Sequence, residues 1–334
     1  MNDLSQRYHS LSRYFRRELG GRVQKIPLDA GFSCPNRDGT LSKRGCIYCN
    51  EKGSGTGGFT AGKSLAEQWD HWRSRYERKY PGAGFMAYLQ AFSNTYGPYE
   101  KLAHTLNRIT GQPVFSDSEH PGPLPGLVGL AVGTRPDCLD QDKLDLLAAQ
   151  PVQEIWLEMG LQSANNTTLQ RINRGHDFAC FTGAVEAASG LVRPGGAQSG
   201  IKVCVHLIAG LPGEDKDDFL STVQQVSALP IHGVKFHNLY VCRNTPLARI
   251  WQQGEYSPLA QAEYVDWLGQ ALTLLRPEIV VQRLTGDPAH GELLAPQWSA
   301  DKSATLALLA ATMTDQDLWQ GKGLSEHEHT RPDW

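Results

Sequence analysis

The sequence lacks any long hydrophobic run, which leaves no candidate for a membrane-spanning helix. Its apolar stretches, such as residues 126–133 and 203–208, are far shorter than the roughly 20 residues that such a helix needs. The opening residues MNDLSQR are not followed by an apolar segment, so we expect no secretory signal. Low-complexity tracts and fixed-period repeats are also missing, which argues against solenoids and disordered tails. With 334 residues, 40% of them apolar, the chain is long enough for a substantial core, and we expect a globular cytoplasmic protein without membrane contact.

The cysteines are few, odd in number and unevenly distributed. Seven cysteines in a chain with no expected export signal are better read as thiols or metal ligands than as a disulfide framework. Three of them, Cys34, Cys46 and Cys49, form the pattern C-x11-C-x2-C. Three thiolates can bind three irons of a [4Fe–4S] cluster and leave the fourth iron free for another ligand. A structural zinc site needs four ligands, but the chain has one C-x2-C pair and no histidine between residues 10 and 70, so the spacing favours iron–sulfur.

Short apolar runs alternate with amphipathic segments along most of the chain. The runs predict β-strands at residues 22–28, 84–92, 127–132, 152–159, 201–208 and 233–241. The segments between them predict helices at residues 64–80, 99–109, 139–150, 165–174, 177–191 and 215–229. Nearly continuous apolar strands that alternate with helices are typical of a parallel sheet covered by helices. The six strands therefore predict an α/β fold, a partial (β/α)6 TIM-like barrel, because a complete barrel needs eight strands and about 250 residues.

This barrel would form the core of the chain at residues 22–255. A helical N-terminal extension, residues 1–21, precedes it, and a helical C-terminal extension with one short strand at residues 278–283 occupies residues 256–334. A doubly wound sheet is the alternative, but its phosphate-binding G-x-G-x-x-G is missing after the first strand. The cysteine pattern follows the first strand, so in a βα barrel it lies at the C-terminal mouth, where such folds carry their chemistry.

Several further motifs occur in a fixed order after the cysteine pattern. They are GTRPDC at residues 133–138, EMGLQS at 158–163, RINRGH at 171–176, HLIAGLPGE at 206–214 and NLYVCRNTPL at 238–247. Together with the cysteines, these motifs resemble the radical S-adenosylmethionine (SAM) superfamily, and most closely a small bacterial family related to the radical half of the Elongator catalytic subunit. Two departures stand out: Gly133 replaces a usual Glu, and little chain follows residue 314 in which to build an acetyltransferase domain.

The resemblance implies two cofactors and an electron donor. A [4Fe–4S] cluster on Cys34, Cys46 and Cys49 would chelate SAM, and one electron from a donor such as flavodoxin or ferredoxin would cleave it to a 5′-deoxyadenosyl radical. Tyr48 would contact the adenine of SAM. The alternative is that Tyr48 is an aromatic residue that packs beneath the loop, and the sequence does not distinguish the two.

The resemblance also implies further SAM contacts beyond the cysteine loop. Gln162 and Arg174 would touch the ribose or the carboxylate of SAM, and an Arg fork suits a carboxylate. A cation in the last turn of a helix is the alternative for Arg174. Ser93 and Asn94 occupy the position at which relatives hold the SAM amine, but a polar turn at a strand end explains both equally well.

Cys138 and Cys242 fall near strand ends, where either thiol could face a substrate. Buried, unreactive thiols are the commoner outcome for lone cysteines. The sequence leaves the roles of both residues open.

The substrate expected from the resemblance is the wobble uridine of tRNA, with its side chain as the site of modification. The chain has 32 Lys and Arg against 35 Asp and Glu, so RNA binding must rest on a local patch. Residues 1–25 hold six basic and two acidic residues, with Tyr8, Tyr14 and Phe15 between them. This pattern suits RNA contact, but an amphipathic helix that caps the barrel has it too. A small metabolite or peptide as substrate, and a metal-containing RNA-binding protein without catalysis, are the alternatives.

Overall fold

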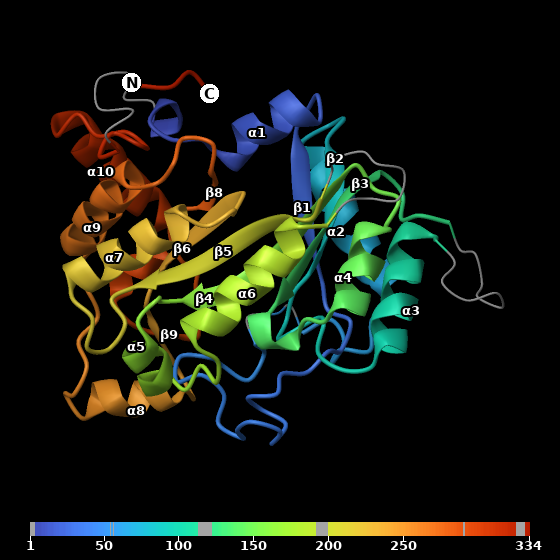
Figure 1. The fold of residues 1–334 in the computed structure, drawn as a ribbon, viewed down its shortest axis with the longest axis horizontal. Coiled ribbons are helices and arrows are strands. Elements are labelled where there is room, and N and C mark those ends of the chain that lie inside the picture. The colour runs from blue at the N-terminus through green and yellow to red at the C-terminus, as the bar shows by residue number, and fades with distance from the viewer. Residues whose placement is uncertain are drawn as a thin grey trace.

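The computed structural model describes residues 4–53, 55, 57–112, 122–191, 200–289, 291–324 and 331–334. Its main sheet has seven strands: β1 (Val23–Leu28), β2 (Gly84–Leu89), β3 (Leu127–Thr134), β4 (Glu154–Gln162), β5 (Lys202–Ala209), β6 (Gly233–Asn238) and β8 (Val280–Arg283). All neighbouring strands are parallel and follow one another in chain order. The sheet curls into a half-barrel with no reversal of strand order (Figure 1). This confirms the predicted partial barrel and excludes the doubly wound alternative, which requires such a reversal.

The sheet has one strand more than the sequence predicted. The segment at residues 278–283 was expected as a short strand in the C-terminal extension, but β8 pairs with β6 and completes the half-barrel. Four residues between two helices give too little periodicity to reveal which sheet a strand will join. The strand predicted to reach Val241 ends at Asn238, and β7 (Val241–Cys242) pairs with β9 (Leu293–Ala295) in a separate antiparallel ribbon.

Helices alternate with the strands, and most of them cover the outer face of the sheet (Figure 1). They are α1 (Leu11–Glu18), α2 (Leu65–Lys79), α3 (Tyr99–Thr110), α4 (Gln141–Ala148), α5 (Asn166–Arg171), α6 (Phe178–Ser189), α7 (Lys216–Ser227), α8 (Pro246–Gln252), α9 (Gln261–Thr273) and α10 (Lys302–Asp315). Short 3-10 turns occur at Leu4–Gln6, Pro136–Cys138 and Gln297–Ala300. No helix among the described residues is long and apolar enough to span a membrane.

The N-terminal helix closes one end of the half-barrel. Tyr14 and Phe15 of α1 are buried against Trp156, which lies on the inner face of the sheet. The Tyr14 hydroxyl donates to Glu154 Oε1 at 2.5 Å, at the start of β4. Because Tyr14 and Phe15 are buried in this packing, the structure favours the alternative that residues 1–25 include an amphipathic helix that caps the barrel.

The inside of the half-barrel changes character along the strands. Near the N-terminal ends it is apolar, with Met86, Trp156 and Cys204 fully buried. Two residues further along the same strands stand Tyr88, Glu158 and His206, and side chains on one face of a strand repeat every second residue. The interior therefore becomes polar toward the C-terminal ends of the strands.

Candidate functional site

A cavity of about 450 Å³ opens at the C-terminal ends of the strands. All three clustered cysteines line it, together with Tyr48, Gln162 and Arg174. The structure thus gathers six of the residues that the sequence singled out, from segments up to 140 positions apart, at the end of a parallel barrel where such folds carry their chemistry. Their roles toward a cofactor stay predictions.

The loop that carries the cysteines is tied to the turn between α5 and α6. Asn173 Nδ2 donates to the carbonyl of Gly45 at 2.7 Å, next to Cys46. Asn36 Nδ2 donates to the carbonyl of Asn173 and lies 3.7 Å from Cys46 Sγ. Arg37 Nη2 donates to the carbonyl of Cys49 at 2.8 Å. These bonds fix a loop that has little regular secondary structure of its own.

The three thiols suit a metal cluster better than a single ion. Among the described residues, no three Cys, His, Asp or Glu side chains are close enough together to hold one ion. Cys34, Cys46 and Cys49 instead stand around a common cavity, and in a [4Fe–4S] cluster each thiolate binds a different iron. An all-thiolate donor set with cations beside it matches the negative charge of such a cluster. The residues present therefore fit the cofactor that the sequence predicted.

Arg174 is buried against the central thiol. Its Nη1 lies 3.5 Å from Cys46 Sγ, and its Nε donates to the carbonyl of Gly160 at 3.2 Å. Burial alone would raise the pKa of the Cys46 thiol, but the Arg174 and Arg135 guanidinium groups lower it. Burial raises the pKa of the Cys49 thiol to about 11. Cys46 is therefore the thiol whose anion the protein stabilises most.

Gly160 leaves the space that Gln162 and Arg174 occupy. A Cβ at Gly160 would lie 2.7 Å from Arg174 Nη2 and 2.8 Å from Gln162 Nε2. Gln162 itself has a φ of 84°, unusual for a residue with a side chain, at a register shift between β4 and β5. This strained strand end brings the amide of Gln162 beside the guanidinium of Arg174, in the cavity.

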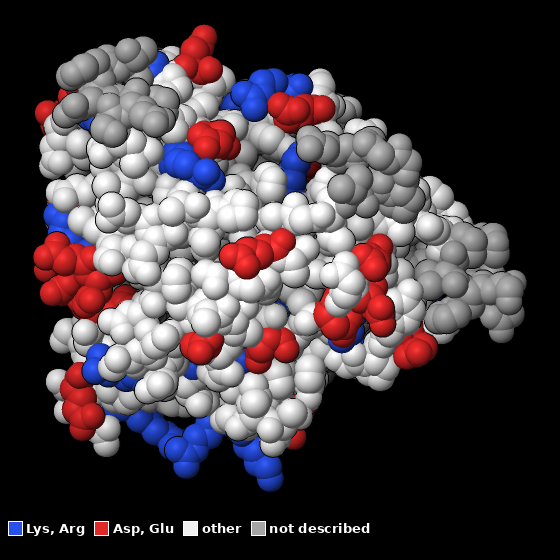
Figure 2. All heavy atoms as spheres, in the orientation of Figure 1, with Lys and Arg blue, Asp and Glu red and all other residues white. Residues whose placement is uncertain are grey.

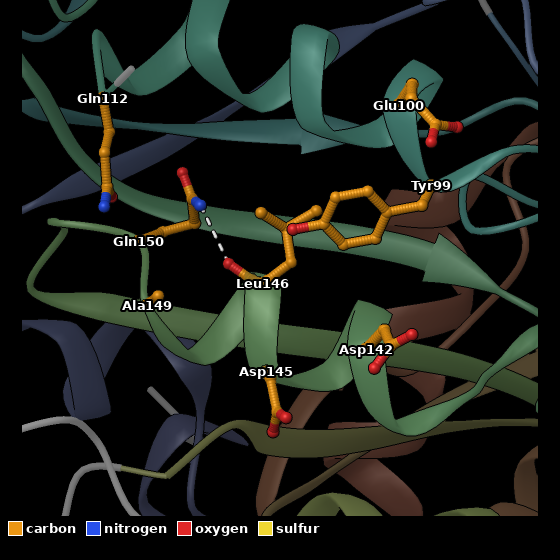
Figure 3. A pocket seen from close by; sticks show the side chains of 8 residues that line it. All are labelled: Tyr99, Glu100, Gln112, Asp142, Asp145, Leu146, Ala149 and Gln150. Atoms are coloured by element: carbon orange, nitrogen blue, oxygen red, sulfur yellow. Dashed lines mark hydrogen bonds between the residues drawn. The ribbon is translucent and has the colours of Figure 1, made fainter. Parts of the chain in front are cut away.

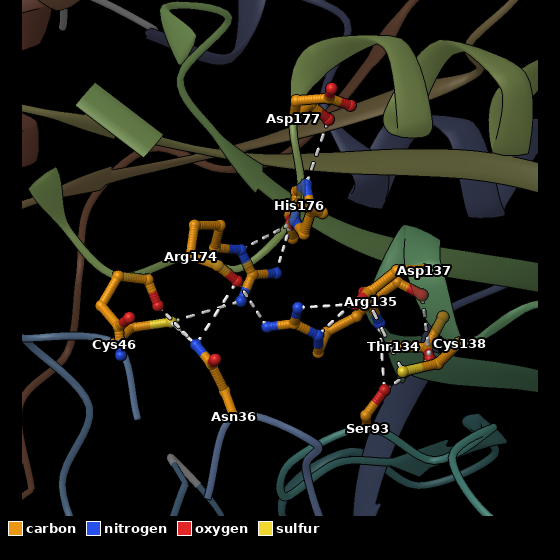
Figure 4. Close-up of polar contacts among 12 residues, drawn as sticks. Asn36, Cys46, Ser93, Thr134, Arg135, Asp137, Cys138, Arg174, His176 and Asp177 are labelled. Atoms are coloured by element: carbon orange, nitrogen blue, oxygen red, sulfur yellow. Dashed lines mark hydrogen bonds and ion pairs between the residues drawn. The ribbon is translucent and has the colours of Figure 1, made fainter. Parts of the chain in front are cut away.

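Arg135 is a second buried cation that sequence reasoning passed over (Figure 4). Its Nη1 donates to the carbonyl of Arg174 at 2.7 Å, and its Nη2 pairs with Asp137 Oδ2 at 2.7 Å. Arg135 follows the third strand and lies inside the GTRPDC motif. A cation at this strand end was the feature of the sequence from which its place near the cavity could have been predicted.

Ser93 and Asn94 lie beneath the cavity and do not line it. Ser93 Oγ shares a hydrogen bond with Thr134 Oγ1 at 2.9 Å and accepts from the Arg135 backbone N–H at 3.2 Å. Asn94 Nδ2 donates to the carbonyl of Gly133 at 2.9 Å. Both side chains are buried in strand-end hydrogen bonds, the arrangement that the polar-turn alternative describes. Neither side chain reaches the surface of the cavity, and their role in binding SAM stays a prediction.

Tyr48, Cys138 and Cys242 differ in their access to the cavity. Tyr48 both lines the cavity and packs against the hydrophobic core, so its two readings are compatible. Cys242 lines the cavity, whereas Cys138 is buried in the 3-10 turn after β3. Burial raises the pKa of each of these two thiols to about 11, which keeps both protonated at neutral pH.

Deeper in the half-barrel lies a group of charges that the sequence analysis missed. Glu158 of β4 is fully buried, and its Oε1 accepts from Lys25 Nζ of β1 at 2.5 Å. Its Oε2 pairs with Lys235 of β6 and lies 3.0 Å from His206 Nε2. Burial alone would raise the pKa of Glu158, but Lys235 and Lys25 hold it well below its usual range. Lys25 Nζ also donates to Gln282 Oε1 of β8 at 2.6 Å, across the open edge of the sheet.

A second hollow lies outside the barrel, between α3 and α4 (Figure 3). Glu100, Asp142 and Asp145 line it, and Gln150 Nε2 donates to the carbonyl of Leu146 at 2.8 Å. The residues that line it include no thiol, no cation and no buried charge. The cavity inside the half-barrel is therefore the candidate active site.

Comparisons with known proteins bear on this site. A model of the Radical SAM superfamily matches residues 42–226, and one of the Radical_SAM C-terminal domain matches residues 231–315. The chain is 34% identical to the uncharacterized protein YtqA of Bacillus subtilis (strain 168), over 96% of this chain and 94% of that protein. It is 24% identical to the tRNA uridine(34) acetyltransferase of Methanocaldococcus jannaschii, over 48% of this chain and 28% of that protein.

A solved structure gives an independent view of the fold. The archaeal Methanocaldococcus infernus Elp3 with an N-terminal deletion matches with a TM-score of 0.66 and 17% identity. The match covers 89% of this chain but 64% of that one, so the chain spans less than two thirds of its solved neighbour. At this identity the similarity supports the half-barrel fold alone.

Proposed function

Because the chain belongs to the radical SAM superfamily, whose members are enzymes, we propose that it cleaves SAM reductively at a [4Fe–4S] cluster and uses the product to modify the wobble uridine of tRNA. The cluster and SAM, when bound, supply one-electron cleavage of the sulfonium and a radical that abstracts hydrogen from the substrate. The proposal includes a cytoplasmic site of action and a flavodoxin or ferredoxin as electron donor.

In this proposal, different residues of the cavity bind the cluster, balance its charge and contact SAM. Cys34, Cys46 and Cys49 hold the three irons, and the loop that carries them is fixed by hydrogen bonds to the α5–α6 turn. Arg174, fully charged in its buried position, balances the negative charge at Cys46. Gln162 and Tyr48 line the cavity beside the thiols, where they would contact SAM.

A single observation carries the proposal: three thiols and a buried guanidinium converge on one cavity at the C-terminal mouth of a parallel half-barrel. The small donor set leaves one iron open, which a closed four-ligand site would not.

The tRNA part of the proposal rests on weaker support. The similarity to tRNA uridine(34) acetyltransferase covers about half of the chain. Basic side chains also project from the lower edge of the molecule in Figure 2, where Figure 1 shows the cysteine loop and α8. The exposed Lys43, Arg44 and Arg249 belong to these segments. A basic rim around the mouth of a cavity suits the RNA backbone, with one base reaching inside.

The test compares modified nucleosides of total tRNA, measured by mass spectrometry, in a deletion strain and its complements. A wobble-uridine precursor should accumulate on deletion and disappear with the wild-type gene, but persist with Cys46→Ala. Cys180→Ala is the matched control, because this half-buried thiol on α6 does not line the cavity, and it should restore the profile. An identical nucleoside profile in all strains would refute tRNA as the substrate and favour a small metabolite.

A further inference from the structure

The interior of the half-barrel has more positive than negative charge. Lys25, Lys235 and Arg283 extend into it from three different strands, and Glu158 is the buried carboxylate among them. Glu158 pairs with both lysines, so one carboxylate already balances two ammonium groups, and the guanidinium of Arg283 adds a further positive charge. We propose that this interior binds an anionic oxygen group of the substrate, a carboxylate or a phosphate, through the guanidinium of Arg283.

Arg283 has no protein partner for its charge. Its half-buried side chain lines the cavity from the end of β8, but forms no ion pair or hydrogen bond with any residue that the structure describes. Two other carboxylates, Glu292 and Asp287, line the cavity. Glu292 accepts hydrogen bonds from Asn50 Nδ2 at 2.6 Å and from Lys52 Nζ at 3.1 Å, and Asp287 is exposed. A planar guanidinium with free donors is the side chain best suited to a carboxylate or a phosphate.

The histidines beside Arg283 do not add to the positive charge. Burial and the neighbouring cations lower the pKa of His206 to about 4 and that of His237 well below its usual value. Both rings are therefore neutral at pH 7, and a neutral ring has one N–H to donate. His206 donates its N–H to Glu158, whose Oε2 lies 3.0 Å from Nε2, so His237 is the ring that can offer an N–H to a bound oxygen. The anion would thus meet one unpaired cation and one neutral donor, while the neighbouring Lys25 and Lys235 are already paired with Glu158.

This position is separate from the one expected for SAM. The cations that most affect the pKa values of Cys34, Cys46 and Cys49 are Arg37, Arg135 and Arg174. Arg283 acts on a different set, Tyr88, His206, Lys235, His237 and Tyr240. The geometry agrees, because Arg174 lies 3.5 Å from Cys46 Sγ, whereas Arg283 ends β8, the strand paired with β6. The cavity therefore has two cationic regions, one at the thiols and one against β6 and β8, and the second remains for the substrate. The inference rests on the proposed function only in calling that ligand the substrate.

Equilibrium dialysis of the cluster-loaded protein tests the inference without turnover. Radiolabelled inorganic phosphate and acetate serve as probes, in the absence of reductant and with saturating S-adenosylhomocysteine to fill the cofactor position. We expect one of the probes to bind, Arg283→Gln to weaken that binding at least tenfold, and Arg283→Lys to weaken it less. Arg108→Gln removes the same charge from the exposed surface of α3, away from the cavity, and should leave binding unchanged. Preference for phosphate indicates a nucleotide phosphate, and preference for acetate a substrate carboxylate.

Three results would overturn the inference. They are no binding of either probe to the wild-type protein, equal losses in Arg283→Gln and Arg108→Gln, and binding that appears only when S-adenosylhomocysteine is omitted. The last would place the anion in the cofactor position. Circular dichroism of each variant checks folding, and Arg283→Lys keeps the test decisive if the Gln variant unfolds. Since no step needs SAM cleavage, a failure here is distinct from a failure of the proposed radical chemistry.

Discussion

Replacing Glu158 with Gln should destabilise the fold more than any other single loss of charge in the half-barrel. The side chain of Glu158 is 0% exposed, and that of its partner Lys235 is 4% exposed. Lys25 is 15% exposed and keeps its hydrogen bond to Gln282. Most of the cost therefore falls on Lys235, which would be left as a buried cation without a counter-ion. Breaking a buried pair in this way costs about 3–5 kcal/mol of unfolding free energy.

The pH dependence of this loss follows from Lys235. Burial lowers the pKa of Lys235 to about 8 although Glu158 raises it, so without Glu158 the pKa falls further. Between this lowered pKa and pH 8, Lys235 of the variant is protonated in the unfolded chain but not in the folded one. The unfolding free energy of the variant therefore rises with pH relative to that of the wild type. The difference between the two proteins should therefore be smaller at pH 8 than at pH 6.5.

Urea unfolding followed by tryptophan fluorescence measures both effects. Glu292→Gln is the control, because Glu292 pairs at the surface with Lys52, whose side chain is 61% exposed, and such pairs contribute about 0–1 kcal/mol. If Glu158→Gln cost no more than Glu292→Gln, the argument that Glu158 balances two charges inside the half-barrel would be refuted.

Two further predictions concern residues around the cavity. Burial lowers the pKa of His206 to about 4, so between pH 6.5 and 4 only the unfolded chain binds a proton at this residue, and the unfolding free energy falls as the pH falls. In urea titrations, His206→Gln should make this fall less steep. The exposed His71→Gln should keep the wild-type slope, and an unchanged slope in both would contradict the reasoning. Gly160→Ala should weaken S-adenosylhomocysteine binding to the cluster-loaded protein about tenfold by displacing Arg174, an effect of ~1.4 kcal/mol. Gly183→Ala, with open space around its Cβ, should bind normally.

Most strands and the cysteine loop could be predicted from the sequence because their signals are local. Apolar runs define the strands to within a few residues, and C-x11-C-x2-C is visible without any tertiary contact. The order of the strands also follows from the chain, since each βα unit places its strand beside the last. This is why Cys46, Gln162 and Arg174 could be expected at one mouth.

The charged interior could not be predicted, because it depends on register and curl. Lys25 and Lys235 are each a lone charge in an apolar strand, and Glu158 is one of two glutamates on β4. These charges are a signal, but their pairing joins residues 77 and 133 positions apart. Strand β8 contributes Arg283 to the same interior, and its membership of the main sheet was not evident from four residues. Likewise, the burial of Tyr14 against β4 is a tertiary contact that the basic, aromatic composition of residues 1–25 conceals.

The measurement that tests the central claim most directly is formation of 5′-deoxyadenosine from SAM by the purified, anaerobically reconstituted and reduced protein. The account predicts turnover by the wild type and by Cys180→Ala. It predicts neither turnover nor the iron–sulfur absorbance in Cys46→Ala, since this thiol lies against Arg174 at the centre of the cavity. Full turnover by Cys46→Ala would contradict the ligand assignment, and no turnover by a cluster-loaded wild-type protein would contradict the proposed chemistry.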